Sequence, residues 1–301
     1  MIIIGGGPAG YTAALYAARA GLDTVLIERL AAGGQMTLTG TIDNYPGFEE
    51  GIDGFTLGMK MQQSARRFGA KTVYAEATAV DFSEKVKKIS TSGEHFLGKT
   101  VVISTGADPR ELGLPNEKAL TGKGIHYCSH CDGGFYRDKS VIVVGGGNSA
   151  AADALYLSRL AAKVCIVHRR DTLRASKVYQ EPLEKAGNIR FVWNSTVSDL
   201  IADEKVTGVK IRNRITDCVT SVNCDGLFIS IGRRPASGFL SGHVKLDPDG
   251  YIAADESTRT SIPGVYAAGD IRTKALRQIV TAVSDGAVAV HYAEEYLAEN
   301  P

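Results

Sequence analysis

The sequence predicts an α/β protein made of two parallel-sheet units that share one local pattern. An apolar run of strand length leads into a glycine-rich turn at residues 2–10, and the same pattern returns at residues 142–150. Further apolar runs of strand length end in glycine or polar residues near 101–106, 226–232 and 264–270. The 34 glycines in the chain suit a fold with many tight turns.

The two glycine-rich segments align without a gap at a constant offset of 140 residues, from Gly5 to Gly145. The match continues through identical residues at 14–16 and 154–156, and an apolar run follows each of them. Each copy therefore reads strand, glycine turn, helix and strand, which is the dinucleotide-binding Rossmann fingerprint. One such motif alone could be structural, but two copies in register favour two nucleotide sites.

Each position of the fingerprint has a physical role. The first glycine allows a tight turn out of the strand, and the second lets the backbone approach a pyrophosphate at the helix N-terminus. A small residue at the third position keeps the helix close to the sheet. The predicted contacts are Gly5, Gly7, Pro8, Ala9 and Gly10 in the first copy, and Gly145, Gly147, Asn148, Ser149 and Ala150 in the second.

The residue that ends the second strand differs between the copies. In the first copy it is Glu28, about 20 residues beyond the glycines, where a carboxylate binds a ribose diol and repels a 2′-phosphate. The aligned residue of the second copy is His168, followed by Arg169, Arg170 and, further on, Arg174. Guanidinium groups bind phosphate with bidentate geometry, so this cluster predicts NADP(H), although a solvated charged loop is the alternative interpretation.

A dithiol lies just before the second copy, in the sequence Cys128-Ser129-His130-Cys131. No second C-x-x-C or paired histidine cluster supplies further zinc ligands, so we expect redox chemistry and no metal site. Two nicotinamide cofactors in one chain would give no simple route for electrons to the dithiol, whereas a flavin accepts a hydride and passes electrons to a disulfide. The sequence therefore predicts FAD in the first site and an electron path from NADPH through FAD to Cys128 and Cys131.

Composition limits the class of protein. The 301 residues are enough for two domains, and 34 Lys and Arg against 33 Asp and Glu give no electrostatic case for nucleic acid or an anionic membrane. A hydrophobic content of 44% and 22% charged residues fit a globular enzyme. Five cysteines, an odd number, argue against a full disulfide framework, so we expect a reducing cytoplasmic location, with no signal peptide and no membrane span.

Between the two copies the chain carries loops, a helix and strands. The segments 33–35 and 43–47 are rich in glycine or turn residues and could line a flavin. Residues 54–69 show a helical pattern of apolar residues. Residues 72–82 and 87–92 are expected to form strands of a small antiparallel layer.

The remaining elements suggest that the chain returns to its first domain. A buried-type strand at 101–107 closes the first part, and a strand within 226–235 closes the second. A further strand within 264–270 ends in Asp270, which could bind a ribityl hydroxyl or cap a helix. The last helix is expected from about Gln278 to Ala298. We therefore expect an FAD-binding domain of residues 1–115 and 243–301, with an NADPH-binding domain of residues 116–242 inserted into it.

Together these motifs resemble the low-molecular-weight thioredoxin reductases over essentially the whole chain. The resemblance rests on the two fingerprints, Glu28, the pairs at 34–35, 269–270 and 277–278, and the segments 44–47, 128–133 and 168–174. It implies two Rossmann-like domains of three-layer ββα type, a homodimer, and thioredoxin as partner. It also implies that the inserted domain rotates, so that the flavin meets NADPH in one orientation and the disulfide in the other.

The resemblance also implies roles for individual residues. Cys131 would face the flavin, Cys128 would attack the disulfide of thioredoxin, and Asp132 would be the acid/base for the thiol pair; a turn or cap role is the alternative for Asp132. Besides the first fingerprint and Glu28, the implied FAD contacts are Gly34, Gln35, Asn44, Gly106, Gly269, Asp270, Arg277 and Gln278.

One departure leaves other interpretations open. The family more often has Ala-Thr between the cysteines, where this chain has Ser129-His130. The imidazole of His130 could stabilise a thiolate and make the dithiol more oxidising, or it could be solvated without consequence.

Three other classes of protein are alternatives. The reductase of an alkyl hydroperoxide system often has such a histidine, although it normally carries an additional N-terminal region and tends to prefer NADH. A flavin reductase for ferredoxin or flavodoxin would lack the dithiol, and a non-catalytic redox-sensing module would need only the nucleotide sites.

Overall fold

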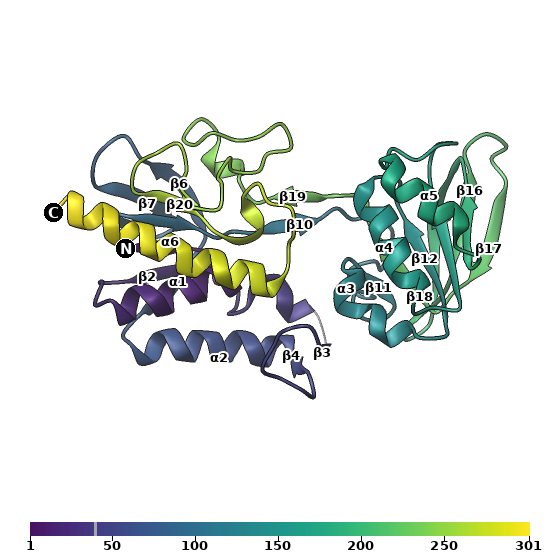
Figure 1. The fold of residues 1–301 in the computed structure, drawn as a ribbon, viewed down its shortest axis with the longest axis horizontal. Helices are drawn as coiled ribbons and strands as arrows, with labels where there is room; N and C mark the ends of the chain where they lie inside the picture. Colours follow the sequence, from purple (N-terminus) through teal and green to yellow (C-terminus); the bar gives the residue numbers. More distant parts are fainter. Residues whose placement is uncertain (39–40) are drawn as a thin grey trace. The chain divides into compact units, whose positions relative to one another are not determined.

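The structure, a computed structural model that describes residues 1–38 and 41–301, divides the chain into two compact units (Figure 1). Unit 1 contains both ends of the chain, and unit 2 is formed mainly from its middle. The bounds are Met1–Gly40, Tyr45–Asp108 and Arg234–Pro301 for unit 1, and Thr41–Asn44 and Pro109–Arg233 for unit 2.

The chain crosses between the units in two strands, β10 (Ala107–Pro109) and β19 (Arg233–Pro235), which pair with each other. The crossings lie earlier in the chain than the domain boundaries expected after residues 115 and 242. After β10 the chain is held by Glu117, whose carboxylate accepts N–H groups of the preceding loop at 2.8 to 3.0 Å. After β19 the chain is anchored by Leu240, which is fully buried in a core of unit 1.

Unit 1 is built on a parallel sheet of five strands in the order β20-β9-β1-β2-β5. The register sets Ile3 beside Leu26 and Val102. Because a parallel sheet is covered on both faces, its strands read as continuous apolar runs, as the sequence does here. The strands are β1 (Ile2–Ile4), β2 (Val25–Glu28), β5 (Lys71–Tyr74), β9 (Val101–Ile103) and β20 (Val265–Ala267).

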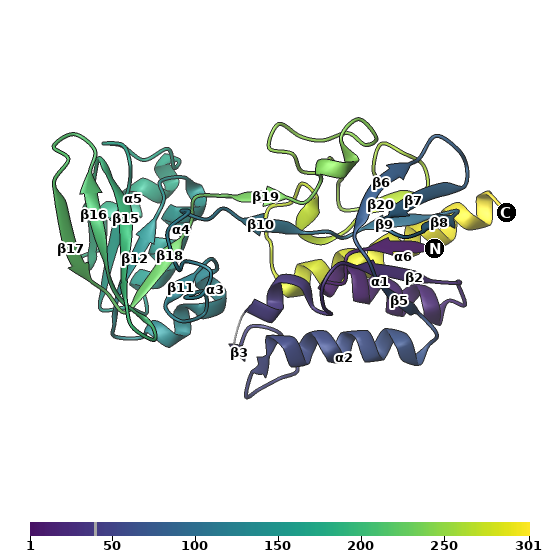
Figure 2. The ribbon, with the colours of Figure 1, turned by 180° about the vertical axis from the view of Figure 1, so that it is seen from behind.

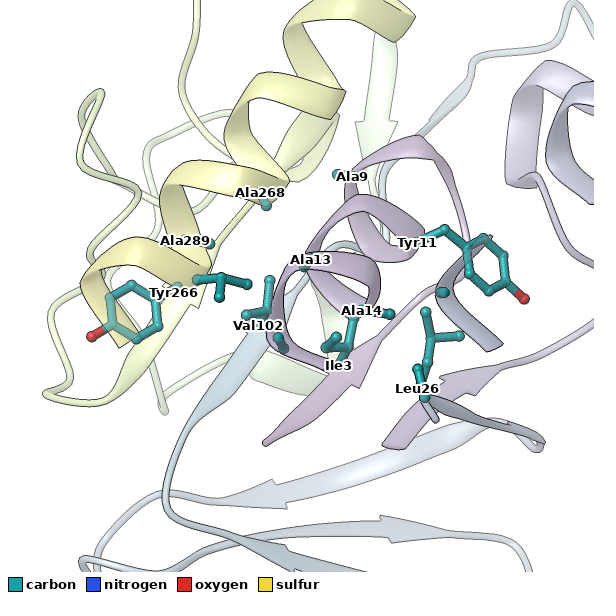
Figure 3. Packing of buried hydrophobic residues seen from close by; sticks show 14 of the residues in the cluster. Ile3, Ala9, Tyr11, Ala13, Ala14, Leu26, Val102, Tyr266, Ala268 and Ala289 are labelled. Atoms are coloured by element: carbon teal, nitrogen blue, oxygen red, sulfur yellow. The ribbon is translucent and has the colours of Figure 1, made fainter. Parts of the chain in front are cut away.

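Different layers cover the two faces of this sheet. On one face Ile3 packs with helices α1 (Pro8–Arg19) and α6 (Ile279–Glu299), which lie side by side (Figure 3). A Cβ on Gly286 of α6 would lie 2.3 Å from the carbonyl oxygen of Ala9, so the absence of a side chain there allows the close approach. The other face packs on an antiparallel sheet of β6 (Ala77–Asp81), β7 (Lys87–Thr91) and β8 (His95–Gly98). The expected three-layer ββα architecture is confirmed.

The structure corrects some element bounds in unit 1. The segment expected as one strand over 72–82 is divided, because β5 joins the parallel sheet and only β6 joins the antiparallel layer. Helix α6 begins one residue later than expected, with Gln278 as its N-cap in a capping box with Thr281. The other elements of unit 1 are the 3₁₀ turns η1 (Gly34–Leu38), η3 (Gly238–Leu240) and η4 (Gly269–Ile271), strand β4 (Ile52–Asp53) and helix α2 (Gly54–Arg67), while strand β3 (Thr41–Ile42) falls in the short segment that belongs to unit 2.

Unit 2 repeats this plan around a parallel sheet in the order β11-β18-β12-β13-β14. Val141 and Val143 face one core with helix α4 (Asn148–Ser158), while Ile142 and Val144 face a second core. The second core is closed by an antiparallel sheet that Figure 2 shows at the edge of this unit. The strands are β11 (Ile125–His126), β12 (Ser140–Val144), β13 (Lys163–Val167), β14 (Ile189–Val192), β15 (Ser195–Ala202), β16 (Val206–Asn213), β17 (Val219–Asn223) and β18 (Gly226–Ile229); helix α3 (Ser129–Asp132), the 3₁₀ turn η2 (Gly133–Tyr136) and helix α5 (Lys177–Lys185) complete the unit.

No helix within residues 1–38 and 41–301 combines the length and the apolar character that a membrane span requires.

Candidate functional site

The first glycine turn leaves an open backbone surface at the N-terminus of α1. Gly5 has a φ of 101°, and its N–H donates to the carbonyl of Ile27 at 2.8 Å. A Cβ on Gly10 would lie 1.9 Å from the carbonyl oxygen of Gly5, so the turn and the helix can meet only through glycine. By contrast, a Cβ on Gly7 would meet no atom within 4 Å. The backbone at Gly7 is therefore open to a pyrophosphate, as the fingerprint requires.

The carboxylate of Glu28 is fixed beside this turn. One oxygen accepts the N–H of Gly6 at 2.5 Å, and the other accepts the N–H of Leu30 at 3.0 Å. The carbonyl of Gly6 in turn accepts the N–H of Gly33 at 2.8 Å, which brings the loop before η1 onto the turn. A Cβ on Gly34 would lie 3.2 Å from the Cα of Gly7. Three predicted FAD residues, Glu28, Gly7 and Gly34, thus lie at one place.

The turn after β20 lies against the same end of α1. Gly269 has a φ of 80°, and a Cβ built on it would lie 3.0 Å from the Cβ of Ala9. Its N–H donates to the buried carboxylate of Asp285 at 2.8 Å. Asp285 also binds Arg272, which is 1% exposed, through two hydrogen bonds of 2.8 and 2.9 Å. No sequence pattern indicates the pair of Arg272 and Asp285. Asp285 holds the Gly269-Asp270 turn in place through its hydrogen bond with the N–H of Gly269.

The other predicted FAD residues are more scattered. Gln35 donates from its side chain to the carbonyl of Ala107 at 2.5 Å, so it lies next to Gly106 at β10. The guanidinium of Arg277 lies 4.2 Å from the ring centroid of Tyr251, and its buried Nε has no hydrogen-bond partner among residues 1–38 and 41–301. Gln278 is the N-cap of α6. Asn44 falls in unit 2, where it donates to the carbonyl of His130 at 3.4 Å.

The second glycine turn is tied to the arginine loop. The carbonyl of Gly146 accepts the N–H of Arg174 at 2.7 Å, and the side chain of Asn148 accepts the N–H of Ser176 at 2.8 Å. Gly147 repeats the open backbone of Gly7, because a Cβ on it would meet no atom within 4 Å. The predicted phosphate donors Arg169 and Arg170 are exposed, and so is Arg174. An exposed guanidinium cluster beside an open helix N-terminus fits a phosphorylated dinucleotide.

His168 has a different environment from the arginines. It is 5% exposed, and its ring lies directly under Gly146, where a Cβ would be 2.1 Å from Cε1. Burial lowers the pKa of His168. A hydrogen bond with the backbone of Thr172 raises this pKa in part, and the nearby charges of Arg169, Arg170 and Arg174 lower it further. Its Nε2 is buried and has no hydrogen-bond partner within the described part of the chain. His168 is therefore a neutral side chain under the turn, with one ring nitrogen available to a bound group.

Cys128 and Cys131 form a disulfide with an S–S distance of 2.07 Å. Cys128 is the N-cap of α3, and its sulfur accepts the N–H of Cys131 at 3.2 Å. The next residue, Ser129, is buried and donates to Asp153 of α4, which also accepts from Ser230 at 2.5 Å. These bonds anchor α3 to the sheet of unit 2, so the dithiol is carried on a fixed support.

The two residues between the cysteines face different environments. His130 is exposed, yet its ring stacks on Tyr156 of α4 with centroids 4.2 Å apart and an interplanar angle of 24°. The imidazole, next in sequence to Cys131, is therefore held against α4 rather than free to rotate. This supports the interpretation that His130 influences the thiolate, because a fixed imidazole acts on a neighbouring charge more strongly than a mobile one.

We expect His130→Thr to lower the reduction potential of the dithiol by about 30 mV, the equivalent of about 1.4 kcal/mol for two electrons. The reason is that the variant removes a ring that stabilises the reduced, thiolate-containing form. Titration against a glutathione redox series measures the potential, with the exposed His95 changed to threonine as the control. An unchanged potential in His130→Thr would show that the ring is a spectator.

Asp132 is buried, with 7% exposure, and pairs with a histidine that belongs to none of the predicted motifs. Its carboxylate lies 3.0 Å from Nδ1 of His126, whose Nε2 lies 2.6 Å from the hydroxyl of Tyr136. No spacing rule connects these three residues, because β11, α3 and η2 are brought together only by the packing of unit 2. The one available signal was a histidine that ends a short apolar segment next to the C-x-x-C motif.

Comparison with known proteins agrees with this architecture. The sequence profile of the pyridine nucleotide-disulphide oxidoreductase family matches residues 1–286. The chain is 44% identical over 300 residues to a thioredoxin reductase of Listeria monocytogenes, covering 99% of this chain and 94% of the relative. It is 45% identical over 301 residues to a thioredoxin reductase of Streptomyces coelicolor, with the same coverage.

A solved structure gives the same result. The crystal structure of thioredoxin reductase from Streptococcus pyogenes superposes with a TM-score of 0.93 at 43% identity, covering 99% of this chain and 97% of that one. Two glycine turns, a disulfide in C-x-x-C spacing and full-length similarity therefore coincide. The chain belongs to the pyridine nucleotide-disulphide oxidoreductase family and, within it, to the low-molecular-weight thioredoxin reductases.

Proposed function

We propose that this chain is an NADPH-dependent thioredoxin-disulfide reductase, which moves electrons from NADPH through FAD to the Cys128–Cys131 disulfide and on to thioredoxin. The observation that carries the proposal is a C-x-x-C disulfide on the same unit as a glycine turn that is hydrogen-bonded to an arginine loop. The thioredoxin reductases that match the whole chain support the same reaction.

We propose that unit 1 binds FAD. The open backbone at Gly7 would receive the pyrophosphate, Glu28 the ribose diol, and the turn at Gly269 and Asp270 the ribityl chain. The unpartnered Nε of Arg277 is a buried donor that a bound group can satisfy. When bound, FAD would supply an electron carrier that can accept a hydride and pass its two electrons to a disulfide.

We propose that unit 2 binds NADPH and prefers it to NADH. Gly147 offers the open helix N-terminus for the pyrophosphate. Arg169 and Arg170 would hold the 2′-phosphate, and the loop that carries them is fixed by Arg214 and Asn194, which donate to their carbonyls at 3.1 and 3.0 Å. A preformed loop loses less conformational entropy on binding, which favours recognition of the phosphate.

The dithiol would act by thiol–disulfide exchange. After reduction, the Cys128 thiolate attacks one sulfur of the partner's disulfide, and a mixed disulfide forms as the partner's S–S bond breaks. The Cys131 thiolate then attacks Cys128, which restores the intramolecular disulfide and releases the partner as a dithiol. Asp132 would take the proton of the thiol pair and return it to the leaving thiolate.

Three further assignments belong to this proposal and rest on the family resemblance: a homodimer, a rotation of the inserted domain during turnover, and a cytoplasmic location. One observation favours a second candidate function. His130 lies inside the C-x-x-C motif and is held by Tyr156, which fits a reductase for another small redox protein of the alkyl hydroperoxide system. The arginine loop argues against that candidate, because those enzymes tend to use NADH.

An anaerobic assay tests the proposed function. The flavin-loaded enzyme is mixed with NADPH or NADH, then with thioredoxin or a peroxiredoxin, and thiol formation is followed. We expect NADPH to exceed NADH in kcat/KM by at least about 100-fold, because two charge-assisted hydrogen bonds contribute about 1.5–3 kcal/mol each. Equal rates with the two nucleotides would contradict the NADPH assignment, and transfer to the peroxiredoxin alone would contradict thioredoxin as the partner.

The arginine loop gives the corresponding mutational prediction. We expect the double change Arg169→Ala and Arg170→Ala to raise KM for NADPH by about 30-fold or more, with little effect on NADH, because only NADPH carries the 2′-phosphate. Steady-state kinetics with both nucleotides measure the effect. Arg212→Ala is the matched control, since this exposed arginine of unit 2 pairs with Asp217 outside the loop. Equal losses with both nucleotides would indicate a structural role only.

A further inference from the structure

A buried chain of three polar side chains lies beside the dithiol. Asp132 is the residue directly after Cys131, and its carboxylate lies 3.0 Å from Nδ1 of His126. Nε2 of the same ring lies 2.6 Å from the hydroxyl of Tyr136. The three residues are only 6 or 7% exposed. Buried polar networks of this kind rigidify their surroundings when every member is satisfied.

The packing around His126 fixes the plane of its ring. His126 is the last residue of β11 and pairs in register with Phe228 of β18, and the two rings stack with centroids 5.2 Å apart at 28°. Tyr136 meets both rings edge-on, at 73° and 80°. A Cβ on Gly226 would lie 2.3 Å from the ring of Tyr136, so the glycine that begins β18 makes room for the phenol.

The direction of the hydrogen bonds follows from Tyr136. Burial raises the pKa of Tyr136, and the charge of Asp132 raises it further, so the phenol stays neutral and keeps its proton. A neutral phenol can donate to Nε2, and because a carboxylate only accepts hydrogen bonds, the 3.0 Å contact with Asp132 calls for the imidazole proton on Nδ1. The carboxylate of Asp132 therefore receives a hydrogen bond from a ring whose tautomer and orientation are both fixed.

We propose that His126 is a positioning residue: it holds the carboxylate of Asp132 in its orientation directly after the C-x-x-C motif, and it is itself held by Tyr136. This inference rests on the proposed dithiol exchange and assigns two residues to the step in which the thiol pair loses a proton. As Cys128 attacks the partner, its proton passes to a carboxylate oxygen of Asp132 and later to the leaving thiolate. His126 is neither oxidised nor reduced, and it retains its own proton on Nδ1.

Other titratable groups near this chain are few and identifiable. Asp225, which precedes β18, acts on Tyr136 through its charge, whereas the neighbouring thiol of Cys224 stays protonated because burial raises its pKa to about 12. The ammonium of Lys139 lies 5.6 Å from the centroid of the Tyr136 ring. On the α4 side, Asp153 is bound to Ser129. None of these groups is the hydrogen-bond donor to Asp132, a role that the geometry gives to His126.

The test uses the flavin-loaded full chain and three variants. His126→Leu fills the space without a donor, His126→Asn keeps an amide N–H near the Nδ1 position, and Tyr136→Phe removes only the hydroxyl that orients the ring. The readout is the pH dependence of disulfide reduction by the NADPH-reduced enzyme, with thioredoxin and with the small disulfide DTNB. Melting temperatures verify that each variant is folded.

We expect His126→Leu to slow dithiol exchange with either disulfide about tenfold, because acid–base catalysis contributes about 10²–10⁴ and only part of it depends on positioning. The acidic limb of its pH profile should move to higher pH, because the variant removes the hydrogen bond that His126 gives to the carboxylate of Asp132. His126→Asn should restore the limb to within about 0.3 units, and Tyr136→Phe should fall between the two.

A second measurement does not depend on turnover. In the folded protein, the Nδ1–H of His126 should give a low-field proton resonance that is protected from exchange, absent in His126→Asn and weakened in Tyr136→Phe. An unmoved acidic limb in His126→Leu, or an Nε2–H tautomer by NMR, overturns the inference. If DTNB is reduced and thioredoxin is not, the proposed function fails while the pH profile with DTNB still decides the role of His126.

Discussion

Cys128→Ser is expected to abolish thioredoxin reduction, with a residual rate below about one thousandth of wild type, because loss of a catalytic nucleophile costs at least about three orders of magnitude. A serine hydroxyl cannot exchange with a disulfide, and Cys131 alone cannot close the intramolecular bond that releases the product. NADPH-dependent thiol formation in thioredoxin, measured anaerobically, gives the rate. Oxidation of NADPH by an acceptor that takes electrons directly from the flavin should persist.

The chain offers a matched control for this variant. Cys218 is an exposed free cysteine of unit 2, outside the C-x-x-C motif, and Cys218→Ser should keep the wild-type rate. Cys131→Ser should be as inactive as Cys128→Ser, but it should trap thioredoxin as a stable mixed disulfide on Cys128, because the resolving thiol is missing. Full disulfide reduction by Cys128→Ser would contradict the whole exchange scheme.

The double Rossmann pattern and the architecture could be predicted because they depend on local sequence. A parallel strand is apolar throughout, a glycine turn follows it, and a helix must pack back on the sheet, so β1-α1-β2 and β12-α4-β13 are visible in the sequence. The structure confirms both units and their parallel sheets. The charge difference between Glu28 and the arginine loop could also be seen, because each residue stands at a fixed distance from its glycine turn.

The antiparallel layers were harder to predict. Strand β17 is largely exposed and alternates weakly, and the exposed Leu97 of β8 removes the pattern that would mark that strand. Residues 72–74 were expected in the antiparallel layer but lie in the parallel sheet, because a short half-buried strand shows no preference for either sheet. Register in such strands is set by partners that are distant in sequence, and no local pattern encodes those partners.

The site divides in the same way. Motif residues that are expected to bind a ligand through backbone turns, such as Gly7 and Gly147, could be named from spacing alone. Residues that support the site through tertiary contacts could not, because His126, Tyr136 and Asp285 belong to no motif. His126 and Asp285 each bind a predicted residue of another element, and Tyr136 binds His126. Their chemistry becomes visible only when distances and burial are known.

Asp285→Ala should lower the free energy of unfolding by about 3–5 kcal/mol, because it leaves buried cations without their counter-charge. Arg272 is 1% exposed and donates two hydrogen bonds to Asp285, and Lys274, with 5% of its side chain exposed, donates a third at 2.8 Å. The N–H of Gly269 would also lose its acceptor. Chemical denaturation measures the loss, and because Gly269 lies on the predicted FAD turn, flavin retention should fall with it.

The pH dependence distinguishes the charge of Asp285 from its shape. Burial opposes ionisation of this carboxyl, but hydrogen bonds from Arg272, Lys274 and Gly269 outweigh it and lower its pKa. A lowered pKa stabilises the fold above the unfolded value of about 3.9, and the contribution is lost as the pH falls through the folded value. The stability difference between wild type and Asp285→Asn should therefore be constant above about pH 5 and shrink below about pH 4.

Glu256→Ala is the control for both Asp285 variants. This carboxylate binds the same Arg272, but 91% of its side chain is exposed, so it should contribute less than about 1 kcal/mol to the free energy of unfolding. A loss as large in Glu256→Ala as in Asp285→Ala would mean that the buried pair does not hold the turn.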